Sequence, residues 1–116
     1  MKDPVSFERI YLYPKPVDMR KQINGLAQLV ENSGISLYES SLFLFTNKQR
    51  RTIKTVYWEK TGFCLWMMRL EEKKFPWPKK NDKQITITCE QFNWLIKGVD
   101  FTKIKAHESL SYQRFS

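Results

Sequence analysis

The side chains that could carry out chemistry in this sequence are few and far apart. The cysteines, Cys64 and Cys89, form no C-x-x-C pair, and the single histidine, His107, lies near the C-terminal end. A nucleophile with a histidine base, or a histidine–cysteine metal site, therefore lacks its partners. Glu71 and Glu72 are adjacent, so on a strand they diverge and share no metal ion. We therefore predict a non-enzymatic protein with no cofactor and no metal site.

Cys64 is predicted to be a core residue on a strand over residues 63–71. One face of that strand carries only apolar side chains, namely Cys64, Trp66, Met68 and Leu70. The other face is apolar up to Met67 and polar from Arg69, which is typical of a central strand with one face partly covered. We expect both cysteines to be reduced thiols of low reactivity, with a disulfide as the open alternative.

The net charge of +8 is concentrated in one stretch of the chain. Residues 48–83 hold eleven basic and four acidic side chains, whereas the rest of the chain holds nine and eight. This concentration indicates an acidic partner such as nucleic acid, and a merely solubilising surface is the alternative. No apolar run approaches the roughly 20 residues that span a bilayer, and the N-terminus lacks a secretory signal. We expect a cytoplasmic protein without a membrane partner.

Apolar periodicity predicts an α+β domain over residues 1–101, followed by a polar tail over residues 102–116. We expect a mainly antiparallel meander of about five strands with two packed helices. The predicted strands cover residues 9–13, 42–46, 52–59, 63–71 and 84–88, and residues 42–46 are apolar on both faces, as in a central strand.

The helix boundaries are predicted from capping residues. Asp18 is expected to begin a helix that runs to about Asn32 and ends at Gly34. A T-x-x-Q capping box is expected to begin a second helix over residues 89–97, closed by a glycine at 98. Gly62 is expected to take a positive φ in the turn between the third and fourth strands.

The segment KKFPWP, residues 73–78, is expected to be an edge or a loop because its two prolines cannot donate ladder hydrogen bonds. Phe75 and Trp77 lie between lysines. Rings in this setting either stack on nucleic-acid bases or anchor the edge of the domain, and the sequence favours neither.

Five segments occur in one order and at one spacing: RIYLY, PVDMRKQINGLAQLV, LFLF, IKTVYWEKTGFCLWMMRLEEKKFPWP and QFNWLIKGVDF. Together they closely resemble the TnpB-type accessory proteins encoded beside the transposase in the insertion sequence 66 family of bacterial mobile elements. The resemblance covers about residues 9–101. It implies an accessory role in DNA transposition, with strand transfer performed by a separate transposase, and it brings no catalytic residues. The chain departs from the family at residues 47–51, where related proteins have a Gly- and Arg-rich turn.

We predict that a basic hairpin, with charges between residues 48 and 54, and a lysine-rich bend over residues 73–83 bind the DNA of the element, the transposase, or both. The predicted DNA-contacting residues are Arg20, Lys21, Lys48, Arg50, Arg51, Lys54, Lys73, Lys74, Phe75, Trp77, Lys79, Lys80 and Lys83. Arg20 and Lys21 are expected in the first helical turn, where positive charge opposes the helix dipole and indicates a role beyond stability. The rival hypothesis is an adaptor that assembles with the transposase or its own copy, through the apolar second sheet face and the tail, without touching DNA.

Overall fold

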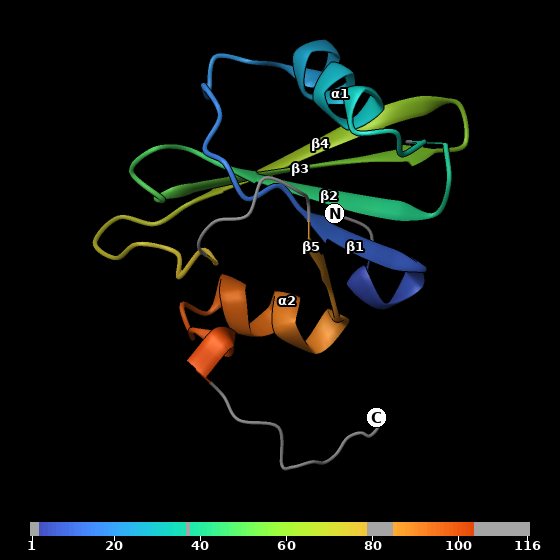
Figure 1. The fold of residues 1–116 in the computed structure, drawn as a ribbon. Coiled ribbons are helices and arrows are strands. Elements are labelled where there is room, and N and C mark those ends of the chain that lie inside the picture. The colour runs from blue at the N-terminus through green and yellow to red at the C-terminus, as the bar shows by residue number, and fades with distance from the viewer. Residues whose placement is uncertain (1–2, 37, 79–84, 104–116) are drawn as a thin grey trace.

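Five strands form one mixed sheet with a helix on each face, as the computed structural model shows for residues 3–36, 38–78 and 85–103 (Figure 1). The strand order is β4-β3-β2-β1-β5. In chain order the elements are β1 (Arg9–Leu12), α1 (Ile23–Asn32), β2 (Ser41–Thr46), β3 (Thr52–Glu59), β4 (Gly62–Arg69), β5 (Ile85–Ile87) and α2 (Cys89–Ile96). Short 3-10 turns cover Pro4–Ser6 and Phe101–Lys103. The α+β class, with five strands and two helices, is confirmed.

The predicted meander is correct only for β2, β3 and β4, which pair antiparallel through two turns. β1 instead pairs parallel with β2, and Ile10 lies opposite Leu42. The reason is α1, which lies between these strands in the chain. A helical crossover returns the chain to the end of the sheet where β1 began, so the next strand runs in the same direction.

One edge of the sheet differs from the sequence-based expectation. β5 pairs antiparallel with β1, and its Ile87 lies opposite Ile10. Among the described strands, β4 therefore lies at the opposite edge beside β3 alone, so its prediction as a central strand is wrong. Its residues are half-buried or exposed because the sheet continues on one side only. β2 is the central strand that its sequence predicts, and all six of its residues are buried.

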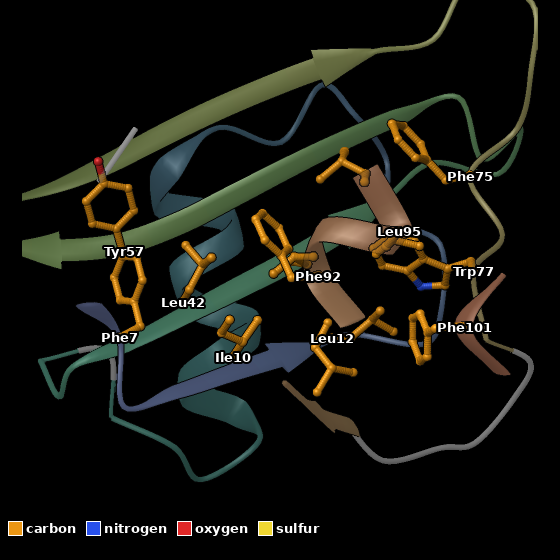
Figure 2. Close-up of a cluster of buried hydrophobic side chains, with 13 residues drawn as sticks. Phe7, Ile10, Leu12, Leu42, Tyr57, Phe75, Trp77, Phe92, Leu95 and Phe101 are labelled. Atoms are coloured by element: carbon orange, nitrogen blue, oxygen red, sulfur yellow. The ribbon is translucent and has the colours of Figure 1, made fainter. Parts of the chain in front are cut away.

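Each face of the sheet packs against one helix and forms its own core. The α1 face buries Tyr11, Leu26, Ala27, Val30, Phe43, Phe45 and Val56. The α2 face buries a larger cluster, shown in Figure 2, that includes Leu12, Leu42, Phe75, Trp77, Phe92, Leu95 and Phe101. The adaptor hypothesis assumed an uncovered apolar second face. That assumption is wrong for the described residues, because both faces are covered by helices.

The helix α1 begins at Ile23 and not directly after Asp18. The Asp18 carboxylate accepts the backbone N–H of Arg20 at 2.9 Å, and the Asp18 carbonyl accepts the N–H of Lys21 at 3.0 Å. These bonds close a separate turn, because an aspartate caps its own local turn as readily as a helix. The predicted helix end is correct, with Gly34 at φ +85°.

The second helix and the β3–β4 turn test the remaining boundary predictions. The capping box of α2 is confirmed in both directions: Thr88 Oγ1 accepts the N–H of Gln91 at 3.0 Å, and Gln91 Oε1 accepts the N–H of Thr88 at 2.8 Å. Gly98 closes the helix at φ +83°. In the β3–β4 turn, however, Lys60 takes the positive φ, at 54°, and the prediction for Gly62 is wrong.

Candidate nucleic-acid interface

The turn between β2 and β3, residues 47–51, contains no glycine and is held by hydrogen bonds to a side chain. Asn47 Oδ1 accepts the N–H groups of Arg51 at 3.0 Å and Thr52 at 3.3 Å. Arg50 takes a φ of 60°, a left-handed conformation that is costly for a residue with a Cβ. Lys48 and Arg50 are exposed and Arg51 is half-buried. The turn is therefore held in one shape that directs its charges outward.

Residues 70–75, at the start of the lysine-rich bend, lie directly beside this turn. Leu70 N–H donates to the carbonyl of Arg51 at 2.8 Å, and Phe75 N–H donates to the carbonyl of Arg50 at 2.7 Å. Between these two attachment points Lys73 and Lys74 are exposed. Two segments more than twenty residues apart in sequence thus form one basic region.

Phe75 and Trp77 anchor the bend and do not form a stacking platform. Their exposed fractions are 1% and 4%, and both rings lie in the α2-face core (Figure 2). Trp77 Nε1–H also donates to the Tyr13 carbonyl at 2.9 Å. Base stacking needs an exposed ring face, so assigning these two residues to DNA contact is wrong for this structure. Of the two interpretations that the sequence left open, the structure supports anchoring.

Lys54 is buried, with 4% of its surface exposed, so its ammonium does not face solvent. Its Nζ donates to the carbonyls of Met19 at 2.7 Å and Lys21 at 3.0 Å. The ammonium therefore ties the turn before α1 to the sheet, so the prediction that Lys54 neutralises a phosphate is corrected. The two bonds hold the backbone on either side of Arg20 against the sheet.

Arg20 and Lys21 are exposed in that turn and precede α1, so the argument from the dipole of its first turn does not apply. The Arg20 guanidinium forms an ion pair with the Asp18 carboxylate, with Nη2 and Oδ2 2.6 Å apart. The hydrogen bonds from Arg20 lower the pKa of Asp18 to about 2. The pair keeps Asp18 ionised, and this offsets part of the positive charge of the turn.

Three segments, residues 18–21, 47–51 and 69–74, meet at one end of the sheet, on the left in Figure 1. We use the term basic surface for their basic residues, which are Arg20, Lys21, Lys48, Arg50, Arg51, Arg69, Lys73 and Lys74. Arg69 was missed from sequence. Arg69 is exposed at the end of β4. It lies opposite Thr52, the first residue after the basic turn. The strand register was the signal that could have found it. The predicted contacts Lys79, Lys80 and Lys83 lie outside the described residues, as does His107.

The described part of the chain offers little reactive chemistry. Cys64 and Cys89 are free and half-buried, and desolvation by burial, together with the charge of Asp3, raises the pKa of the Cys89 thiol. No cluster of three or more histidine, cysteine or carboxylate side chains is found among the described residues. None of the described helices combines the length and the apolar character that crossing a membrane requires.

The comparisons with known proteins point to one family. The family model described as IS66 Orf2 like protein matches residues 8–106. The chain belongs to this family. Its members are accessory proteins of insertion sequence 66 elements, so the resemblance identified from the sequence is confirmed.

Two relatives come from Sinorhizobium fredii strain NGR234. The uncharacterized protein y4jC is 33% identical over 98 residues, which cover 84% of each chain. The uncharacterized protein y4hO is 27% identical over 94 residues, which cover 80% of this chain and 82% of its own. No solved structure matches significantly.

Proposed function

We propose that this IS66 Orf2-like protein is a non-catalytic accessory factor that binds the DNA of its mobile element through the basic surface. The observation that carries the proposal is the convergence of three charged segments at one end of the sheet. Residues 18–21, 47–51 and 69–74 together hold eight basic and three acidic side chains. A family role in transposition supplies DNA as the natural acidic partner. Its place of action would be the cytoplasm.

The arrangement is suited to contacts with the phosphate backbone. Lysine and arginine side chains on turns can neutralise phosphates without reading base edges. The turns themselves are fixed by the amide of Asn47, the ammonium of Lys54 and the buried ring of Phe75. Fixing the backbone before binding lowers the entropy lost when the complex forms. We therefore expect binding to duplex DNA with little sequence preference from this surface alone.

The proposal is tested by measuring affinity for a fluorescent DNA duplex over a series of salt concentrations. The logarithm of the affinity should fall linearly with the logarithm of salt, by about 0.9 for each phosphate neutralised. The triple variant Lys48→Glu, Arg50→Glu and Arg51→Glu should flatten that slope while the domain stays folded. Lys48 and Arg50 are exposed and Arg51 is half-buried, and charges on surface turns contribute little to stability.

A charge-matched control separates the basic surface from net charge. The triple variant Lys97→Glu, Lys103→Glu and Lys105→Glu makes the same charge change outside the basic surface. It should weaken binding less. Equal losses in both variants would attribute binding to net charge, and no binding by folded protein at low salt would overturn the proposal.

A second candidate function is an adaptor that assembles with the transposase of the same element without touching DNA. Membership in the family supports a transposase-related partner. Copurification of the two proteins from cells carrying the element, with and without nuclease treatment, distinguishes the candidates. A complex that survives nuclease and withstands the Lys48, Arg50 and Arg51 triple substitution favours the adaptor.

A further inference from the structure

The part of the chain that the structure describes leaves the outer edge of β4 without a strand partner along its whole length. Among the described elements, β3 is its only strand partner (Figure 1). Proteins protect open edges with short strands, prolines, bulges or charges, because unpaired backbone groups recruit another strand. β4 has eight residues and no proline, and its ladder with β3 is continuous. Residues 62–68 carry no charge.

The backbone groups on this open edge can be assigned from the ladder. Beyond the end of β4, Leu70 N–H donates to the Arg51 carbonyl at 2.8 Å, in the register of the β3–β4 pair. Antiparallel pairs alternate between hydrogen-bonded and non-hydrogen-bonded, so the even-numbered residues of β4 face β3. The backbone groups of Phe63, Leu65 and Met67 therefore face away from the sheet.

We propose that two copies of this chain pair antiparallel through β4 and form a two-fold symmetric dimer with a continuous sheet. A two-fold axis at Leu65 pairs residue 65 with itself, Phe63 with Met67, and Cys64 with Trp66. This register matches all seven uncharged residues with one another and places Arg69 opposite Thr61, so no like charges meet. It also covers Met67, whose exposed fraction of 55% is high for an apolar residue.

The occupant is a second copy because this edge is complementary to itself. The opposite edge, β5, has three residues and is too short to receive an eight-residue strand. Pairing of β4 with β4 therefore closes at two subunits and does not continue into a fibre. A strand of another protein would also find the open backbone groups, and the measurements below distinguish that outcome from self-pairing.

The mass of the purified protein, measured by light scattering across a concentration series, tests the proposal. We expect a dimer with a dissociation constant on the order of micromolar, as for a small interface. Met67→Lys should weaken it at least tenfold, since Met67 then presents a charge to Phe63 of the other copy. Val99→Lys is the matched control, because Val99 is also exposed and apolar and the added charge is the same. It should leave the dimer intact.

Salt dependence separates dimerisation from DNA binding. Each copy carries a net charge of +8, so added salt should strengthen the dimer by screening repulsion, whereas it should weaken DNA binding. Amide exchange should show concentration-dependent protection at Phe63, Leu65 and Met67. The proposal would be overturned if the protein were a monomer at a concentration 100-fold above about 1 µM. A dimer without this protection, or equal losses of affinity from both lysine variants, would also overturn it. Protection of β4 that arises only with the transposase would overturn it in favour of that partner.

Discussion

Lys54→Met removes a buried ammonium and keeps most of the side chain's apolar length. In the structure Nζ donates to two carbonyls, at 2.7 and 3.0 Å, that lie in the turn before α1. Hydrogen bonds from a charged donor contribute about 1.5 to 3 kcal/mol each. Burying the ammonium also costs several kcal/mol of desolvation, which opposes the stabilisation by these hydrogen bonds. Methionine avoids that cost. We expect the difference to be a net loss of about 1 to 3 kcal/mol in the free energy of unfolding.

Urea denaturation measures this loss, with Lys48→Met as the control. Lys48 is exposed on the neighbouring turn, so its substitution should change the unfolding free energy by no more than about 0.5 kcal/mol. Lys54→Met should also increase the rate of amide exchange, relative to the wild type, more in residues 18–22 than in α2. Stability equal to or above that of the wild type would refute the role of Lys54, because desolvation would then outweigh the two hydrogen bonds.

Three further predictions concern local geometry. Arg50→Gly should raise the unfolding free energy by about 0.5 to 1 kcal/mol in urea denaturation, because glycine accepts the φ of 60° without strain; a loss of more than 1 would contradict this. Thr88→Ala should lower it by about 1 kcal/mol through loss of the capping box, and no change would count against that cap. Asp18 should titrate near pH 2 in carbon-detected NMR, and Arg20→Ala should return its pKa toward 3.8. Because the folded pKa is lowered, the stabilisation by Asp18 is complete above pH 3.8 and is lost as the pH falls through 2; a wild-type pKa near 3.8 would refute the ion pair.

The strands and the second helix were predictable because their signals are local. Alternation of isoleucine with threonine located β5, and the T-x-x-Q pattern at Thr88 located the start of α2. The parallel pairing of β1 with β2 was not predictable in this way. It depends on how α1 carries the chain across the sheet, which a pattern of single residues does not encode. The turn at Asp18 was missed because the same residue caps a turn or a helix equally well.

The candidate site was predicted in part. The sequence located the exposed charges of Lys48, Arg50, Lys73 and Lys74, because polar turns lie on the surface. It misassigned Lys54 and Trp77, whose roles depend on tertiary contacts with Met19 and Tyr13. The available signal for burial was that Lys54 is surrounded by apolar and threonine side chains over residues 52–58 of its strand. Charge alone does not distinguish a residue that binds a ligand from one that positions its neighbours.

Chemical-shift mapping with a short DNA duplex tests the central claim most directly. On titration at low salt, the largest amide shifts should fall in residues 18–21, 47–51 and 69–74. The aromatic cluster of Tyr38, Trp58 and Phe63 lies near the opposite end of β3 and β4, and its shifts should stay small. Shifts centred on that cluster or on α2, or no shifts at all from a folded protein, would contradict the claim that this family member binds DNA through its basic surface.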